Sequence, residues 1–261
     1  MQTEAEAKAC CADLYQSDVA KLIMGDTLHP GGLGLTNKLG RLMGLKHGDL
    51  VADLASTRGH SAQALSRVFH CSVLGIEFGA EAVHDAHLAA TKSSDVSFVR
   101  GDAEKLPLRR GAFDAAVCEC SVSLFINKAQ AISETARLLK PGGRFGLSDV
   151  TIEPGALPEE LRGELGQVLC MTSALTADGY VDLLEEGGFT VSDRVDASSE
   201  ILKILDEAKG KLAAFLAFQR MSGAPNGDGP LERSPELVAK VRSMVLDGEL
   251  GYWLFVGEKD S

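Results

Sequence analysis

The stretch VADLASTRGHSA, residues 51–62, decides the fold because it combines the end of a buried strand with a loop and the start of a helix. Asp53 lies at the end of the apolar run, and Gly59 permits a sharp entry into a helix that begins at Ser61 or Ala62. In such an arrangement, backbone N–H groups near the helix N-terminus point into the crevice above the sheet. The stretch therefore predicts a binding site for an anionic or carboxylate-bearing ligand.

From residue 50 onward, short β-rich runs alternate with amphipathic helical patterns. Strands are predicted at residues 50–54, 72–77, 96–100, 114–118 and 144–150. The runs between them, SAQALSRVF, AEAVHDAHLAATK and KAQAISETARLLK, place apolar residues on a helical stripe. LKPGG, residues 139–143, predicts a helix end followed by a turn. This alternation is typical of βαβ units and predicts an α/β fold with a mostly parallel sheet.

The segments on either side of this region have different patterns. Residues 1–46 predict an N-terminal helical cap or lid that is broken at GDTLHPGG. Residues 47–151 are the predicted ligand-binding core. Residues 152–261 predict further helices, one of them over residues 161–175, and closing strands that end with GYWLFVG at residues 251–257. We expect these closing strands to join the same sheet.

The overall charge and the distribution of apolar residues exclude several classes of partner. The chain of 261 residues carries a formal net charge of -11, with no basic run, whereas nucleic-acid binding needs a cationic surface. The first residues lack the basic and apolar regions of a signal peptide, and no uninterrupted apolar stretch is long enough to span a bilayer. We therefore expect a cytoplasmic protein with a small-molecule partner, without nucleic acid or membrane.

The six cysteines are expected to stay reduced in the cytosol, and they are therefore candidates for packing residues or soft ligands. They are Cys10, Cys11, Cys71, Cys118, Cys120 and Cys170.

Acidic residues follow the next two predicted strands. Glu77 closes the second strand, where a carboxylate can accept hydrogen bonds from both hydroxyls of a ribose. Asp102 and Ala103 follow the third strand and are placed to border an adenine ring. A purely structural turn would explain Asp53 and Gly59 alone. Three strand ends in register favour a nucleotide-like ligand.

Four segments together resemble the successive motifs of class I S-adenosylmethionine-dependent methyltransferases. They are VADLASTRG, GIEFGAEAV, GDAEKLPLRRGAFDAAVC and LLKPGGRFGLSDV. The resemblance implies an enzyme with a Rossmann-like core and a seven-stranded, mostly parallel sheet with helices on both faces, whose last strand is antiparallel. It implies S-adenosylmethionine as cofactor, and the residues implied to surround it are Asp53, Ala55, Thr57, Gly59, Glu77, Asp102, Ala103 and Cys118.

The opening loop departs from the family pattern D-x-G-x-G-x-G. Ala55 and Thr57 occupy the first two glycine positions. A Cβ atom at a position that needs positive φ, or close approach of a ligand, carries a steric penalty. We expect the cofactor to bind with an affinity that these two side chains can reduce.

The segment after the fourth strand indicates the methyl acceptor. CECS, residues 118–121, stands where amine-directed nucleic-acid methyltransferases carry an N-P-P-Y type motif, which argues against a base as acceptor. CECSVSLFINK and CMTSALTADGYVDLLEEGGF resemble segments of arsenite methyltransferases instead. That resemblance implies a metalloid held by Cys120 and Cys170, with Cys10 or Cys11 from the arm, and no resident metal. The family's later cysteine is missing.

Physical chemistry favours the same acceptor. Trivalent arsenic is thiophilic, and thiolates are the ligands that select soft centres. Three thiolates would leave its lone pair exposed, whereas two would need an external thiol such as glutathione. We therefore expect methyl transfer from S-adenosylmethionine to arsenite or a related thiophilic species.

Other interpretations of these residues stay open. A cysteine is often a small buried hydrophobe. His29 is interpreted as a turn residue rather than a base, and Glu119 as either a ligand contact or a buried, hydrogen-bonded carboxylate. The same motifs also resemble quinone-type methyltransferases, so a small organic oxygen, nitrogen or carbon acceptor is the alternative. A non-catalytic binding protein with this fold is the second alternative.

Overall fold

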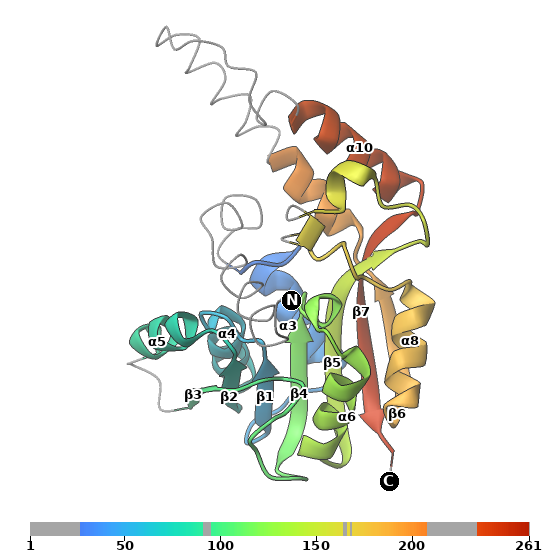
Figure 1. Ribbon diagram of the computed structural model, residues 1–261. Coiled ribbons are helices and arrows are strands. Elements are labelled where there is room, and N and C mark those ends of the chain that lie inside the picture. Colours follow the sequence, from blue (N-terminus) through green and yellow to red (C-terminus); the bar gives the residue numbers. More distant parts are fainter. Residues whose placement is uncertain (1–26, 91–94, 164–165, 168, 208–233, 261) are drawn as a thin grey trace, which may run out of the picture.

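A seven-stranded sheet forms the centre of the molecule (Figure 1). The computed structural model describes residues 27–90, 95–163, 166–167, 169–207 and 234–260. The strand order is β3-β2-β1-β4-β5-β7-β6, and β7 runs antiparallel to both of its neighbours. The strands are β1 (Leu50–Leu54), β2 (Ser72–Glu77), β3 (Val96–Arg100), β4 (Phe113–Glu119), β5 (Leu139–Ile152), β6 (Phe189–Asp196) and β7 (Leu250–Lys259). The predicted fold class is confirmed, including the antiparallel last strand.

Helices cover both faces of this sheet. They are α3 (Gly32–Leu42), α4 (His60–Phe69), α5 (Ala80–Ala89), α6 (Lys128–Leu138), α8 (Ala177–Glu186) and α10 (Ser234–Leu246), with short 3-10 turns η1 (Val122–Leu124) and η2 (Glu159–Leu161). Figure 1 shows α3, α4 and α5 on one side and α6 and α8 on the other. Successive side chains along a strand point alternately to the two faces of the sheet. Val51 belongs to the buried cluster that contains Leu65 of α4, and Ala52 belongs to the cluster that contains Ile132 of α6.

Two predicted segments differ from the structure. Helix α6 ends at Leu138 as expected, but residues 139–143 continue directly into β5 rather than forming a separate turn. Leu139 pairs with Phe113, and a register shift before Ala115 absorbs the irregular residues as a β-bulge. The helix expected over residues 161–175 is not continuous in the described residues, because turns surround Cys170, whose φ is 60°.

The order of the strands places a crevice at one edge of the sheet. The chain moves outward from β1 through β2 to β3 and then returns to place β4 on the other side of β1. Ligands of open α/β sheets bind beyond the carboxyl ends of the strands at such a reversal. Leu54 at the end of β1 pairs with Ile76 of β2 and with Cys118 of β4. The carboxylates of Asp53, Glu77 and Glu119 therefore end adjacent strands at this edge.

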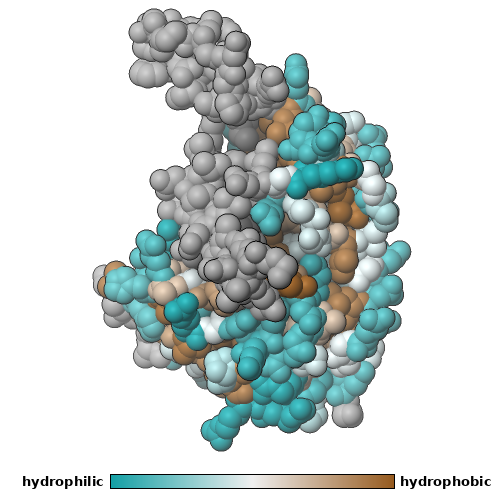
Figure 2. All heavy atoms as spheres, in the orientation of Figure 1, coloured by the Kyte–Doolittle hydropathy of each residue, from teal (hydrophilic) through white to brown (hydrophobic). Residues whose placement is uncertain are grey.

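The surface carries mixed side chains. On the face in Figure 2, hydrophilic residues cover most of the lower edge, and hydrophobic residues are interspersed among them higher up. In the described part of the chain, no helix combines the length and apolar character needed to cross a membrane.

Asp149 on β5 is a fully buried carboxylate that organises the turn after β4. Its Oδ2 accepts from the Ser123 N–H at 2.8 Å, and its Oδ1 accepts from the Ser123 hydroxyl and the Val150 N–H, both at 2.8 Å. Burial raises the pKa of Asp149 to about 6, although these hydrogen bonds oppose the rise.

This raised pKa predicts a specific pH dependence of stability. Protonated Asp149 favours the fold below the ordinary pKa of 3.8, and this contribution is lost as the pH rises through about 6. The shift corresponds to about 3 kcal/mol. We therefore expect the free energy of unfolding of the wild type to fall relative to that of Asp149→Asn as the pH rises from about pH 4 to about pH 6. Above about pH 6, the difference between the two proteins should stay constant. Denaturant unfolding measures both free energies. A difference that is constant across this range would contradict the assignment.

Candidate active site

The loop between β1 and α4 has the left-handed backbone conformation that glycine favours, although two of its expected glycines are replaced by Ala55 and Thr57. Ala55 has a φ of 55° and Thr57 a φ of 46°, both in the left-handed region that L-residues rarely adopt. Gly59 has a φ of 76°, and a Cβ atom there would lie 2.1 Å from Cζ of Phe98. Gly59 is therefore required on two grounds, whereas Ala55 and Thr57 hold the loop shape under strain.

Glu77 fixes this loop from the neighbouring strand. Its Oε2 accepts the Thr57 N–H at 3.0 Å, and its Oε1 accepts the Gly79 N–H at 2.7 Å. Burial raises the pKa of the Glu77 carboxyl, and the hydrogen bonds from Gly79 and Thr57 limit the rise. The Phe78 N–H also stabilises this anion, and because a carboxylate has about four acceptor sites, Glu77 keeps accepting capacity for a ligand hydroxyl.

Asp53 lies deeper in the crevice and is 3% exposed. Burial, with the nearby carboxylates of Glu119 and Glu77, raises its pKa well above the usual range, although the Ala62 N–H stabilises the anion. Its Oδ2 atom is buried and has no hydrogen-bond partner among the described residues. A buried acceptor of this kind needs a donor, and a ligand in the crevice can supply one.

The remaining predicted cofactor residues lie along the same edge. Asp102 follows β3, and its Oδ1 accepts the Glu104 N–H at 2.9 Å. Ala103 beside it is 9% exposed. Cys118 of β4 is fully buried, and burial, with the nearby Asp149, raises the pKa of its thiol well above the usual range. Cys118 therefore contributes a neutral wall rather than a thiolate.

Glu119 at the end of β4 joins three segments through one carboxylate. The Ser61 hydroxyl donates to its Oε2 at 2.6 Å. The Thr36 hydroxyl lies 3.1 Å from Oε1 and 3.0 Å from Oε2. His29 Nε2 lies 3.7 Å from Oε2. His29 occupies a turn, as expected, but it is buried at 3% exposure and faces the crevice carboxylate.

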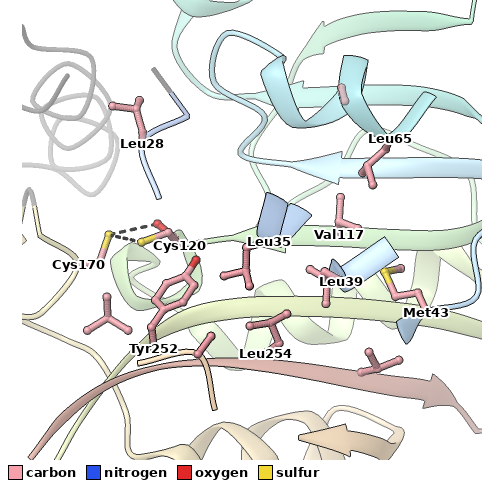
Figure 3. Packing of buried hydrophobic residues seen from close by; sticks show 14 of the residues in the cluster. Leu28, Leu35, Leu39, Met43, Leu65, Val117, Cys120, Cys170, Tyr252 and Leu254 are labelled. Carbon is pink, nitrogen blue, oxygen red and sulfur yellow. Dashed lines mark hydrogen bonds between the residues drawn. The ribbon is translucent and has the colours of Figure 1, made fainter. Parts of the chain in front are cut away.

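Cys120 and Cys170 come together although 50 residues separate them in the sequence. Their Sγ atoms are 3.3 Å apart as thiols, and the Cys170 thiol also donates to the Cys120 carbonyl at 3.2 Å (Figure 3). Both side chains are 0% exposed, and both residues have positive φ, 52° and 60°. The Tyr252 ring lies next to Cys120 in Figure 3, with its hydroxyl 3.0 Å from Ser148 Oγ.

The other cysteines do not join this pair. Cys10 and Cys11 lie outside the described residues. Cys71 precedes β2 at the opposite edge of the sheet, where burial raises the pKa of its thiol to about 11. The described residues contain no group of three or more His, Cys, Asp or Glu side chains that could hold a metal ion.

Comparisons with known proteins agree with this geometry. Residues 52–147 match the family model described as "Methyltransferase domain". An O-methyltransferase of Pyrenophora dematioidea is 26% identical over 160 residues, which cover 60% of this chain and 60% of that protein. An arsenite methyltransferase of Halobacterium salinarum is 27% identical over 217 residues, which cover 76% of this chain and 54% of that protein.

The fold also matches solved structures over its whole length. The crystal structure of the cyclase SpnF superposes with a TM-score of 0.72 at 22% identity and covers 99% of this chain and 96% of that one. By contrast, the chain spans little more than half of the length of the two curated relatives, 60% and 54%.

The strained loop gives a direct prediction for stability. The left-handed region costs an L-residue about 1–2 kcal/mol, whereas glycine adopts it freely but has more entropy in the unfolded chain. Ala55→Gly and Thr57→Gly should each leave the free energy of unfolding unchanged or raise it by up to about 1 kcal/mol. The matched control is Ala136→Gly in the last turn of α6, which should lose up to about 1 kcal/mol in denaturant unfolding. An equal loss at residue 55 would contradict the left-handed conformation.

Proposed function

Because residues 52–147 form a class I S-adenosylmethionine-dependent methyltransferase domain, we propose that this chain transfers a methyl group to a small acceptor held at the Cys120–Cys170 thiol pair. Arsenite or a related thiophilic metalloid is the favoured acceptor. The observation that carries this proposal is the 3.3 Å approach of two thiols from distant segments beside the crevice. The similarity to an arsenite methyltransferase supports it independently.

The crevice residues fit the cofactor. S-adenosylmethionine supplies an electrophilic methyl group on a sulfonium centre. Glu77 keeps accepting capacity for a ribose hydroxyl, and the unpartnered Oδ2 of Asp53 offers an acceptor to a cationic donor. Asp102 and Ala103 would border the adenine, and the loop of Ala55, Thr57 and Gly59 would surround the methionine end.

The separation of the two sulfurs suits a pyramidal metalloid. If each sulfur bonds to one shared atom at about 2.3 Å, the length typical of zinc thiolates, sulfurs 3.3 Å apart subtend about 92° at that atom. This angle is close to the right-angled geometry of a trivalent centre that carries a lone pair. It is smaller than the angle of a tetrahedral site. The separation of the pair is therefore compatible with a trivalent thiophile.

The third ligand would come from elsewhere. In our proposal it is Cys10 or Cys11 of the arm, or an external thiol such as glutathione. The chain then holds the acceptor at a fixed place beside the crevice, so its contribution is proximity and orientation rather than a strong base. Because both thiols are fully buried, the acceptor would also be shielded from water once it is bound.

A small organic acceptor is the second candidate. The buried Glu119 carboxylate, surrounded by the Thr36 and Ser61 hydroxyls, is the polar feature that could serve such an acceptor. The similarity to an O-methyltransferase favours the same reading. A non-catalytic role is the third candidate, because Ala55 and Thr57 replace two glycines of the family's cofactor loop.

The thiol pair is tested by single substitutions. Cys120→Ser and Cys170→Ser should each weaken arsenite binding by more than about tenfold, which equals about 1.4 kcal/mol, because a hydroxyl is a poor ligand for a soft centre. Calorimetry with arsenite and detection of methylated arsenic give the two readouts. Affinity for S-adenosylmethionine should be unchanged.

Cys71→Ser is the matched control, since Cys71 is equally buried but lies at the opposite edge of the sheet. It should leave arsenite binding at the wild-type level. Methylation of an organic acceptor that neither Cys120→Ser nor Cys170→Ser affects would favour the second candidate. A folded wild type without affinity for S-adenosylmethionine would favour the non-catalytic role.

The raised carboxyl pKa values predict how cofactor binding depends on pH. Asp53 and Glu77 both have a pKa above the ordinary value, so each takes up a proton at a higher pH than an exposed carboxyl does. A cationic ligand favours the ionised forms. Its affinity should therefore fall as the pH decreases through the raised pKa values of the two carboxyls, and binding in that range should release protons. Calorimetry in two buffers of different ionisation enthalpy measures both effects. An affinity independent of pH would contradict the role of these carboxylates.

A further inference from the structure

The side-chain hydroxyls of Ser148 and Tyr252 form a buried pair beside the thiols. Both side chains are 0% exposed, and Tyr252 Oη lies 3.0 Å from Ser148 Oγ. This hydrogen bond uses one of the two hydroxyl protons, and among the described residues neither hydroxyl has a second hydrogen-bond partner. A buried donor needs an acceptor, and Figure 3 shows the Tyr252 hydroxyl directed toward Cys120. Burial, and after it the Cys120 thiol, raises the pKa of this hydroxyl well above its usual range.

The backbone around Cys120 places its thiol on the face of the sheet that carries Tyr252. The Ser148 carbonyl accepts the Cys120 N–H at 2.7 Å, so one residue of β5 contacts both Cys120 and Tyr252. Cys120 follows β4 directly, and its φ of 52° breaks the alternation of the strand. Cys118 belongs to the buried cluster on the α6 and α8 face, whereas Cys120 belongs to the cluster that contains Tyr252. A strained conformation therefore brings the thiol to the phenol.

The two thiols of the pair differ in their contacts. The Cys170 thiol donates to the Cys120 carbonyl at 3.2 Å, and this hydrogen bond is lost when the thiol loses its proton. The Cys120 thiol donates to the Cys170 sulfur, which is a weak acceptor. A hydrogen bond from the protonated form favours that form, whereas a donor that faces the sulfur favours the thiolate. Cys120, beside the Tyr252 hydroxyl, is therefore the thiol whose surroundings favour ionisation.

The charges around the thiols make such a donor necessary. The carboxylates of Glu119 and Asp149 both act on the Tyr252 hydroxyl, and His29 is the basic side chain that faces Glu119. Two carboxylates disfavour a third negative charge in buried surroundings. A thiolate at Cys120 therefore needs a hydrogen-bond donor, and the phenol lies in position to provide one.

We propose that Cys120 is the thiol that attacks the acceptor first, that Cys170 forms the second bond, and that Tyr252 and Ser148 are positioning residues that stabilise the Cys120 thiolate. In the first step, the Cys120 sulfur bonds to the arsenic of arsenous acid, one As–O bond breaks, and the hydroxide leaves as water with the proton that the thiol has released. Cys170 then forms the second As–S bond, and a second hydroxide leaves as water with the Cys170 proton. The remaining hydroxide is exchanged for the third ligand. This order rests on the proposed metalloid acceptor.

The role of Tyr252 is tested by the rate of arsenite binding. Stopped-flow ultraviolet absorbance follows As–S bond formation after arsenite alone is added to the full chain. Tyr252→Phe should slow this step by about tenfold near neutral pH, because a hydrogen bond to a charged group contributes at this level. The difference from the wild type should shrink as the pH rises, since the thiolate then forms without the help of the phenol. A defect that does not depend on pH would make Tyr252 a structural residue and overturn the proposal.

The matched control is Tyr180→Phe, which removes a second buried phenol hydroxyl. Tyr180 is also 0% exposed, and its hydroxyl has no hydrogen-bond partner among the described residues. It belongs to the cluster on the other face of the sheet, although both thiols act on it electrostatically. Tyr180→Phe should leave the rate of arsenite binding at the wild-type value, and both variants should keep their affinity for S-adenosylmethionine. Equal slowing in Tyr180→Phe and Tyr252→Phe would indicate a general effect on packing and overturn the proposal.

The order of attack is tested with single-thiol variants. Cys170→Ser keeps Cys120, and it should form its As–S bond about tenfold faster than Cys120→Ser, which keeps Cys170. The other cysteines are the same in both variants, so the difference reports on this pair alone. Adding Tyr252→Phe to Cys170→Ser should remove the advantage.

The inference and the proposed function fail differently in this experiment. If the wild type binds arsenite but the two single-thiol variants react at equal rates, or Cys120→Ser reacts faster, only the inference is overturned. If the wild type binds no arsenite, the proposed acceptor is refuted and the inference falls with it.

Discussion

The binding edge depends on one carboxylate that accepts hydrogen bonds from two loops. The N–H groups of Thr57 and Gly79 converge on Glu77, and this contact ties the loop after β1 to the loop after β2. Without this side chain, two backbone donors near the crevice would lose their partners. The strained backbone at Ala55 and Thr57 persists because its surroundings fix it from this side, and because Gly59 fits closely against Phe98 on the other. Asp53 is placed by the pairing of β1 with β2 and β4.

The sequence predicted the strands well and the connections less well. Apolar runs define β1, β2 and β3 to the residue. β1 is buried along nearly its whole length, whereas β3 at the end of the sheet alternates between buried and exposed residues. Residues 139–143 were misread because proline and glycine usually end regular structure, whereas here a bulge opposite Phe113 accommodates them. Helical periodicity around Cys170 was overridden by tertiary packing against β4, since the Cys170 thiol contacts the Cys120 carbonyl.

The site residues that belong to a sequence motif could be predicted, whereas those brought together only by the tertiary fold could not. Asp53, Glu77 and Asp102 follow strand ends, so their common edge could be deduced from the alternation of elements. The contacts of Glu119 with His29 and Thr36 bring together residues more than 80 positions apart, and no local pattern encodes them. The available signal was the carboxylate of Glu119 at the end of the fourth strand. His29, which lies close to it in the structure, was interpreted from the sequence as an ordinary turn residue.

The position of β7 has a consequence for how the chain folds during synthesis. This strand follows β6 in the sequence, but it lies between β5 and β6 and pairs with both. Until it has left the ribosome, β6 has no partner in the sheet and one edge of β5 stays open. Unpaired edges are places where nascent chains associate wrongly. Tyr252 of β7 also lies beside Cys120, so the surroundings of the thiols are completed after those of the carboxylates on β1 and β2.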